Sequence, residues 1–354
     1  MIKRARQRRL VCRRVAISLS YLSFDWYRPP TSISDDLDAI GAALPSGISA
    51  ALNMASQRLT LPPIGRGATR ERFQTLAEVA AIDLSLGRIF EGHGDALEIL
   101  RTAGLEARSG SYGVWAADTP ALAATESGGV WLLDGTKGYC SGAPFLDHAL
   151  VTAQAGDRSR LFEIDLGRQF HLVADSWPSV GMAASQSFTI ELEDAPAVRC
   201  VGEPDYYTQR PGFWQGSLNV PACWFGSALG LARGVLNRLG CDTSPHTWAA
   251  FGLLSSEIES ISAVLNAATE ATDLDPLDKS GLGKQRAFSV RHLVYQSVSR
   301  VIELAGEIGG TGGFTHDAEQ SRRLADLPIY LRQHHPGRDS EALGRMSFAR
   351  YSGG

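Results

Sequence analysis

The sequence predicts an α+β protein: an N-terminal helical domain, a middle antiparallel β-barrel or sandwich, and a C-terminal four-helix bundle. Two observations carry this prediction. Apolar residues recur at three- and four-residue spacings before about residue 110 and after about residue 205, the period of helices with one buried face. Between these regions the period becomes that of short strands separated by turn residues. We therefore divide the chain into residues 1–30, 31–110, 111–204 and 205–354.

Size and composition limit the function classes. A chain of 354 residues is expected to form several layers or subdomains. Its net charge of −4 gives no general affinity for nucleic acid or anionic lipid, and no apolar run approaches the ~20 residues of a membrane span. The cysteines are odd in number, widely scattered and without zinc-type spacing, so we expect no metal site and a reduced, cytoplasmic setting: Cys12, Cys140, Cys200, Cys223 and Cys241.

The first thirty residues are strongly basic. Seven Lys or Arg residues and no acidic residue precede Asp25. A secretory signal would need an unbroken apolar segment, which Arg13 and Arg14 interrupt. A nucleic-acid-binding arm is the alternative, but neither interleaved aromatic residues nor a second basic patch supports it. We expect a disordered or over-extended start that ends at Pro29-Pro30.

The helical region is clearest over residues 69–86, where apolar residues mark one buried face. We predict a break at residues 90–94 (FEGHG) and a second helix over 95–103. Phe90 and His93 in this break are candidates to line a substrate cavity. Histidine beside glycine also commonly serves in a cap or turn, and that structural role is the alternative for His93.

The middle region centres on residues 130–153. Asp134-Gly135 predicts a hairpin turn, since both residues tolerate positive φ, and the segment 141–144 (SGAP) cannot continue a regular ladder. The hairpin would deliver the ring of Tyr139 and the hydroxyl of Ser141 to an irregular ledge that suits a flat, hydrogen-bonding cofactor. An ordinary β-meander with a surface turn is the alternative. Strands are predicted over 112–117, 130–133, 149–153, 160–164, 170–173 and 188–192.

The last third of the chain predicts four helices with short connections, the pattern of an antiparallel bundle. Small residues dominate the first helix, which indicates closely packed neighbours. The predicted helices cover residues 217–239, 247–272, 284–308 and 321–334.

Residues 135–143 (GTKGYCSGA), followed by Asp147 and by 149–151 (ALV), resemble the segment NGxKxWITNG…AD…LV of the acyl-CoA dehydrogenases. In that family the aromatic residue and the hydroxyl lie against the flavin ring, so the resemblance implies these roles for Tyr139 and Ser141. Residues 113–118 (GVWAAD) resemble the family strand YCVTEP and add Trp115, Ala117 and Asp118 to the implied flavin site. Ala117 stands where the family usually has a threonine hydroxyl.

Further segments follow in the order of the family. Residues 181–195 resemble GxRxSxTxxLxFxDVxVP, whereas residues 119–124 (TPALAA) replace the family's Gly/Ser-rich loop for the acyl-CoA phosphates. Residues 307–314 (EIGGTGGF) resemble QxxGGxGF, which holds flavin adenine dinucleotide (FAD) across a subunit interface, although such a run can also simply end a helix. The implied cofactor-binding residues from the last part of the chain are Glu307, Gly310, Gly313 and Arg338.

The family's catalytic carboxylate has no counterpart. Asp326, Ile329 and Tyr330 match the segment RDxxIYxIYEG, and an ungapped count from Phe314 places His334 at the glutamate. The alternative glutamate position falls near Val220. A histidine can act as a base near neutral pH, so we predict His334 as the catalytic residue. A cationic feature at a helix C-terminus is the alternative role of this residue.

The resemblance implies an FAD-dependent oxidoreductase that performs the α,β-dehydrogenation of an acyl thioester or related small molecule. A flavin-dependent monooxygenase on the same fold is the first alternative, and a catalytically degenerate binding or scaffold subunit is the second. The implied partners are a second copy of the chain, in a homodimer or homotetramer, and an electron-transfer flavoprotein or a flavin reductase.

Overall fold

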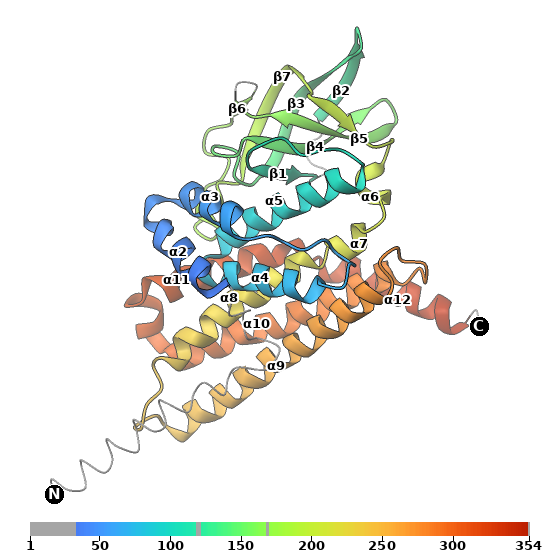
Figure 1. Cartoon of the computed structure of the whole chain (residues 1–354). Helices are drawn as coiled ribbons and strands as arrows, with labels where there is room; N and C mark the ends of the chain where they lie inside the picture. The colour runs from blue at the N-terminus through green and yellow to red at the C-terminus, as the bar shows by residue number, and fades with distance from the viewer. Residues whose placement is uncertain (1–32, 118–121, 168–169, 353–354) are drawn as a thin grey trace, which may run out of the picture.

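The computed structural model describes residues 33–117, 122–167 and 170–352. The predictions for the basic segment 1–30 and for Asp118 lie outside these residues. Helices form both ends of the described chain, and eight strands form one sheet between them (Figure 1). This arrangement confirms the α+β fold class predicted from the change of period. None of the described helices is both long enough and apolar enough to cross a membrane.

The N-terminal helices pack around a buried central helix, α5. Asp83 separates α4 from α5, and its side chain caps α5 by accepting a hydrogen bond from the Leu86 amide at 2.9 Å. The predicted break at residues 90–94 is therefore wrong, because α5 runs through it without interruption. The elements are α2 (Ser34–Ala43), η3 (Leu44–Ser46), α3 (Ile48–Arg58), α4 (Thr69–Ile82) and α5 (Leu84–Thr102).

Close packing explains why α5 tolerates its glycines. A Cβ on Gly94 would lie 2.4 Å from Leu61 Cδ1, and a Cβ on Gly92 would lie 3.0 Å from the Arg88 guanidinium. Glycine costs a helix about 1 kcal/mol relative to alanine. Contacts on nearly every side of α5 outweigh this cost, since the helix lies between the sheet and the C-terminal helices (Figure 1).

The sheet has the strand order β6-β7-β3-β2-β4-β5-β8, and β1 pairs with β4 beside this path. Most pairings are antiparallel as predicted, but β1 and the start of β2 each pair with β4 in parallel. Strands β2 and β8 were not predicted. The strands are β1 (Tyr112–Trp115), β2 (Leu122–Ser127), β3 (Val130–Cys140), β4 (His148–Ala155), β5 (Arg158–Asp165), β6 (His171–Leu172), β7 (Phe188–Pro196) and β8 (Arg199–Val201).

The predicted hairpin turn at Asp134-Gly135 is wrong. Strand β3 continues through these residues, and its register against β7 shifts between Leu133 and Gly135, so the positive φ of Gly135 belongs to a bulge. The turn lies earlier, at Gly128-Gly129 between β2 and β3, where both residues have positive φ.

The C-terminal region contains the four predicted helices, with altered ends, and further helices before and after them. Pro336, which follows the predicted helix 321–334, begins α12, and proline suits the first turn of a helix because its missing N–H would have no helical partner there. The elements are α6 (Tyr206–Gln209), α7 (Phe213–Gly216), α8 (Asn219–Leu236), α9 (Pro245–Leu274), α10 (Gly283–Thr315), α11 (Ala318–Tyr330), η5 (Leu331–Gln333) and α12 (Pro336–Ser352). A close backbone contact joins α8 to α4, where a Cβ on Gly226 would lie 2.0 Å from the Ala77 carbonyl oxygen.

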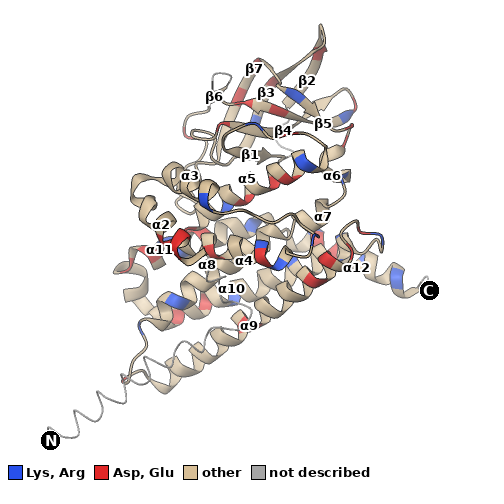
Figure 2. Cartoon of the chain, in the orientation of Figure 1, with Lys and Arg blue, Asp and Glu red and all other residues tan. Residues whose placement is uncertain are grey.

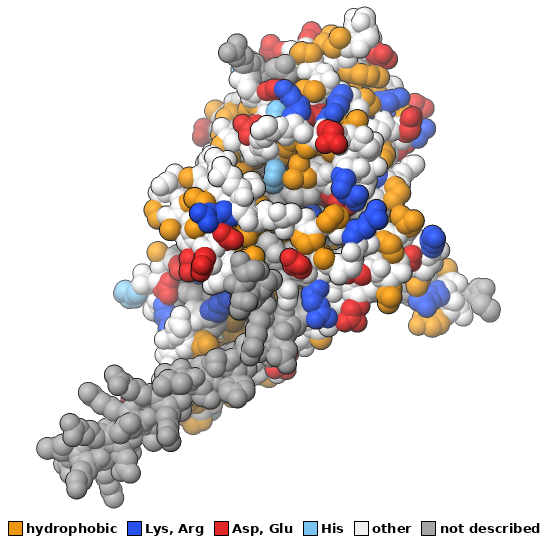
Figure 3. Space-filling view, viewed as in Figure 1, with side chains coloured by type: hydrophobic (Ala, Val, Ile, Leu, Met, Phe, Trp, Pro, Cys, Tyr) orange, Lys and Arg blue, Asp and Glu red, His pale blue; other side chains and the backbone are white. Residues whose placement is uncertain are grey.

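Within the described residues, charged side chains of both signs are mixed. Figure 2 shows acidic and basic residues interspersed on the helices and the sheet, and Figure 3 shows the same mixture on the surface that faces the viewer. This distribution agrees with the small net charge of the sequence.

Candidate functional site

The end of β3 presents an aromatic ring on a strained backbone. Tyr139 has a φ of 60° and is 62% exposed, and the register between β3 and β7 shifts again between Lys137 and Cys140. A non-glycine residue in this region costs about 1–3 kcal/mol and is found mostly at functional sites. The Tyr139 ring packs edge to face against Trp177, with 6.5 Å between the ring centroids. We call Trp115, Tyr139, Ser141 and Trp177 together the ledge; Tyr139 is exposed, Trp177 is half-buried, and Trp115 and Ser141 are buried.

A chain of buried hydroxyls supports Ser141. The Oγ atoms of Ser141 and Ser187 are 2.8 Å apart, those of Ser187 and Ser185 are 2.8 Å apart, and Ser185 Oγ donates to the Met182 carbonyl at 2.7 Å. Each hydroxyl has one proton. Because Ser185 gives its proton to the carbonyl, Ser187 must donate to Ser185, and Ser141 must donate to Ser187. Ser141 Oγ therefore offers only lone pairs to any further partner.

Trp115 holds the backbone of the ledge in place. Its buried indole Nε1 donates to the Ser141 carbonyl at 3.1 Å, and Gly113 leaves room for the ring, since a Cβ there would lie 2.8 Å from Nε1. The structure thus brings the Trp115 side chain to the backbone of Ser141, two residues after Tyr139. The cofactor-binding role of these residues stays a prediction. Ala117, half-buried, follows β1 by two residues.

Helices α5 and α11 meet the sheet beside the ledge. Asp326 of α11 accepts a hydrogen bond from the Met182 amide at 2.5 Å, and Trp177 Nε1 donates to the Met182 carbonyl at 3.0 Å. Burial raises the pKa of Asp326 to about 6, against the lowering effect of the Met182 amide. Ser85, at the start of α5, lies 3.9 Å from the Met182 sulfur. The loop around Met182 thus connects the ledge to both helices.

A row of charged residues follows one face of α5 away from the ledge. Arg88, Glu91 and Asp95 are spaced at three and four residues, and Arg88 Nη1 lies 2.8 Å from Glu91 Oε2. Burial raises the pKa of Glu91 to about 7, because desolvation outweighs the opposing effect of Arg88. Desolvation is also the largest influence on Arg88, but Glu91 overcomes it and the pKa of Arg88 is raised. Since arginine does not lose its proton in proteins, Glu91 is the member of the pair whose protonation state changes with pH.

The side chains next to the row on α5 are only partly covered. Arg88 keeps 16% of its side chain accessible, and Tyr207 and Arg291 are also only partly buried. Desolvation is nevertheless the largest influence on each of the three groups, and it raises the pKa of Tyr207 and lowers that of Arg291. From strong desolvation combined with remaining accessibility we infer a cleft, and we call the space between α5, α8, α10 and α11 the α5 cleft.

Several buried polar groups around the α5 cleft have no hydrogen-bond partner among the described residues. Trp224 packs edge to face against Tyr330, with centroids 6.3 Å apart, and the Arg291 guanidinium lies 5.1 Å from the Trp224 ring centroid. Each such group costs about 1–3 kcal/mol when it stays unpaired. The groups around the cleft that can donate are Arg72 Nη2, Gln215 Nε2, Asn219 Nδ2, Trp224 Nε1 and Tyr330 Oη.

His334, the predicted base, lies in the connection between η5 and α12 and is 2% exposed. Its Nε2 is 3.3 Å from His292 Nδ1, and its Nδ1 is 3.1 Å from Asp339 Oδ2, although this second contact is not aligned as a hydrogen bond. Desolvation lowers the pKa of His334, with Asp339 opposing the shift. The ring is thus held neutral, with both nitrogens next to other side chains.

The two predicted cavity residues on α5 face the sheet and the core. Phe90 is fully buried in the main hydrophobic cluster. His93 Nδ1 accepts a hydrogen bond from the Tyr112 amide at 3.1 Å, and burial lowers the pKa of His93 to about 4. The neutral imidazole therefore satisfies the first amide of β1.

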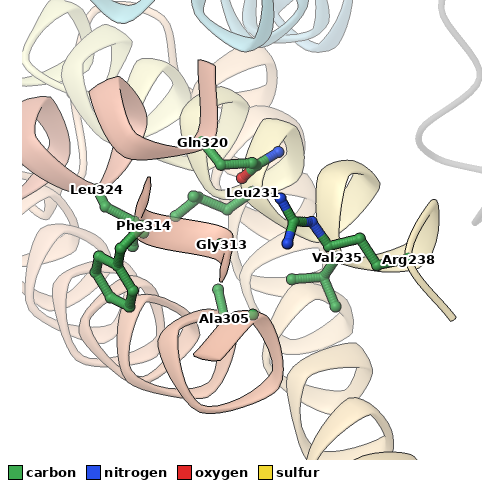
Figure 4. A pocket seen from close by; sticks show the side chains of 9 residues that line it. Leu231, Val235, Arg238, Ala305, Gly313, Phe314, Gln320 and Leu324 are labelled. Atoms are coloured by element: carbon green, nitrogen blue, oxygen red, sulfur yellow. The ribbon is translucent and has the colours of Figure 1, made fainter. Parts of the chain in front are cut away.

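The glycine-rich segment of α10 forms a separate feature. Gly310 has φ 53° and ψ −162°, so the helix is interrupted there, and buried Gly313 lines a small pocket with residues of α8 and α11. In Figure 4, Arg238 enters this pocket from just beyond α8 and Gln320 from α11. Glu307 and Gly310 are exposed. No hydrogen bond or ring contact among the described residues joins this segment to Tyr139 or Ser141.

Arg338 has 73% of its side chain exposed and contacts Asp339 and His335. These contacts place it at the start of α12, next to His334, and not with the glycine-rich segment.

The sequence reasoning missed the α5 cleft. Glu91, Arg291 and Trp224 were not singled out, because the expected break at residues 90–94 hid the helical spacing of Arg88, Glu91 and Asp95. Charged residues at positions i, i+3 and i+7 of a helix that is otherwise buried would have been the signal.

Known structures share this fold. TdsC, a dibenzothiophene monooxygenase from Paenibacillus sp. A11-2 solved with FMN and indole, is 17% identical, with 89% of this chain and 96% of TdsC covered at a TM-score of 0.71. KijD3, solved with dTDP, is 18% identical, with 92% and 99% covered at 0.73. Glutaryl-coenzyme A dehydrogenase, solved with glutaryl-CoA, is 15% identical, with 80% and 79% covered at 0.65.

No protein-family model and no curated protein sequence matches the chain. The identities to the solved structures are low enough that the similarity establishes the fold alone. The chain has the acyl-CoA dehydrogenase fold, on which known structures include both dehydrogenases and flavin-dependent monooxygenases.

Proposed function

We propose that the chain is a flavin-dependent oxidoreductase that binds its flavin on the ledge and acts on a small molecule in the α5 cleft. The observation that carries this proposal is Tyr139, an exposed aromatic ring on a strained backbone beside the Ser141 hydroxyl. A flat ring system with polar edges fits such a surface, because stacking and a hydrogen bond can act together. The cofactor predicted from the sequence is FAD, whereas TdsC was solved with FMN.

The bound flavin would supply the electron transfer. The chain's own residues would orient it: the Tyr139 ring provides a flat contact, Ser141 accepts a hydrogen bond, and Trp115 fixes the Ser141 backbone. Helices α5 and α11 lie next to the ledge, and their contacts with Met182 hold the loop beside it in place.

The direction of the hydroxyl chain favours one of the two candidate reactions. Reduction adds a proton to a ring nitrogen of flavin, which turns an acceptor into a donor. Ser141 donates its proton to Ser187, so its Oγ offers only lone pairs to a ligand. This acceptor matches a reduced flavin ring better than an oxidised one. A reaction that begins with reduced flavin and oxygen, monooxygenation, is therefore the first candidate, with a flavin reductase as partner.

Dehydrogenation of an acyl thioester is the second candidate, with His334 as the base. Its lowered pKa keeps the imidazole neutral at pH 7, the form that accepts a proton. The buried Glu91 carboxyl group is a second candidate base, since burial brings its pKa to about 7. The oligomer that the glycine-rich segment implies remains a proposal, and light scattering of the flavin-loaded protein would test it.

The experiment is a flavin titration of the purified protein, under air with oxidised FAD and FMN, and without oxygen with the reduced forms. We expect flavin binding, with the reduced form bound more tightly. Ser187→Ala should remove the preference, because Ser141 can then turn its proton toward the ligand. Ser176→Ala, outside the hydroxyl chain, is the control. A protein that takes up neither flavin in either state contradicts the proposal and favours the scaffold reading.

A further inference from the structure

The α5 cleft carries a chemical signature of its ligand. Four of the five unpartnered groups around it are N–H donors, and the fifth, the Tyr330 hydroxyl, can donate. The orientation of the Asn219 amide is fixed, because its oxygen accepts from Arg72 Nε at 3.1 Å and an arginine can only donate. Buried polar groups in folded proteins are almost always paired. A surplus of donors at one place therefore requires a ligand that brings acceptors.

The arginine side chains around the cleft also indicate a ligand that brings acceptors. Arg72 and Arg291 are strongly desolvated, yet neither lies within ion-pair distance of a carboxylate among the described residues. Arg291 donates instead to the carbonyls of Ser217 and Gln333, at 2.9 and 3.0 Å. Arg88 uses one nitrogen for Glu91, which leaves its other donors free for a ligand. Carboxylates such as Asp95 and Asp339 act on the two strongly desolvated arginines only from beyond ion-pair distance. Buried charges are normally compensated by a direct partner, which an anion in the cleft would supply.

We propose that the α5 cleft binds the substrate through an oxyanion, held by Arg291 and Arg88 and by the donors Tyr330 and Trp224. This inference rests on the proposed function for the identity of the bound molecule as the substrate. A polar cleft of this kind selects a compact charged molecule over a long apolar acyl chain. Planar guanidinium groups match both carboxylate and phosphate oxygens, and the two sources are distinguished below.

The experiment is isothermal titration calorimetry on the full chain, with and without bound FMN. Benzoate and benzamide are the probes, since they share a shape and differ in charge, and phenyl phosphate tests the second oxyanion. We expect benzoate to bind at least tenfold more tightly than benzamide. Tighter binding of phenyl phosphate than of benzoate would assign the cleft to phosphate esters, and the reverse would assign it to carboxylates.

Two variants test the residues. Arg291→Gln should abolish the preference for benzoate over benzamide, whereas Arg300→Gln on the exposed side of the same helix should leave it unchanged. Arg291→Gln also removes a contact with Trp224 and could reduce binding by disturbing the fold, so a second variant is needed. Tyr330→Phe removes only a hydroxyl that has no partner among the described residues, and should weaken benzoate about fivefold to tenfold with the melting temperature unchanged or raised.

Equal affinity for benzoate and benzamide would overturn the inference, as would a Tyr330→Phe protein that binds benzoate as the parent does. Flavin uptake separates this outcome from the proposed function. If the protein binds no flavin but binds benzoate, and the variants lose this binding, the anion site is supported and the oxidoreductase function is not. If the protein binds flavin but does not prefer benzoate to benzamide, the proposed function is supported and the anion site is not.

Discussion

Replacing His93 by asparagine should change how the stability of the protein depends on pH. The neutral His93 imidazole accepts a hydrogen bond from the Tyr112 amide, and burial lowers its pKa from 6.5 to about 4. Between these two pH values the unfolded chain binds a proton that the folded protein does not bind. The folded state therefore loses stability as the pH falls from 6.5 to 4, by about 3 kcal/mol at 1.36 kcal/mol per pKa unit.

His93→Asn keeps an oxygen that can accept from the Tyr112 amide but cannot be protonated. Urea unfolding followed by far-UV circular dichroism at pH 7.5, 6.5, 5.5 and 4.5 would measure the difference. We expect the variant to lie within about 1 kcal/mol of the parent at pH 7.5 and to lose markedly less stability towards pH 4.5. His171→Asn, at an exposed position of β6, is the control. If the parent and His93→Asn lose stability in parallel, the imidazole is not held neutral by burial, and its assignment as the partner of β1 fails.

Three further predictions follow from the structure. The effect of pH on stability should have the opposite direction at Glu91, whose pKa is raised from 4.5 to about 7. The free energy of unfolding should therefore fall by up to about 3 kcal/mol as the pH rises through this range. The same urea series should show no such fall for Glu91→Gln. Gly226→Ala should destabilise the protein by about 1–3 kcal/mol in urea unfolding, because the new methyl group meets the Ala77 carbonyl, whereas Gly252→Ala on α9 has open space and should be neutral or stabilising; equal effects would contradict the close helix contact. His334→Ala should leave flavin binding intact and lower dehydrogenase turnover by ~10²–10⁴-fold in a stopped-flow assay if His334 is the base, and unchanged turnover would assign this residue to the connection before α12 alone.

The main features of the fold could be predicted because they depend on local sequence. A helix with a buried face repeats its apolar residues every 3.6 positions and a strand every two, so the change of period marked the sheet and both helical regions. Tyr139 and Ser141 of the ledge could also be predicted, since they are close in sequence and lie at the end of one strand. The alternation of buried and exposed positions along one helix or strand is recorded in the local sequence, whichever elements pack against it.

Signals that depend on partners were misread. A positive φ at Gly135 serves a turn and a bulge equally well, and only the pairing of β3 with β7 decided for the bulge. The glycines of residues 90–94 predicted a break, but the sheet on one side of α5 and the helices on the other supply enough contacts to keep the helix continuous.

The sequence by itself indicated the order of the elements through local periodicity, and short motifs indicated Trp115, Tyr139 and Ser141 of the ledge. Trp177 was not predicted. Tertiary structure alone decided the α5 cleft. Its charged row lies on one helix, but the residues around the row come from distant parts of the chain. Arg72, Arg291 and Tyr330 are up to 258 positions apart, from residue 72 to residue 330. Desolvation depends on everything that surrounds a group in space, and no local pattern records it.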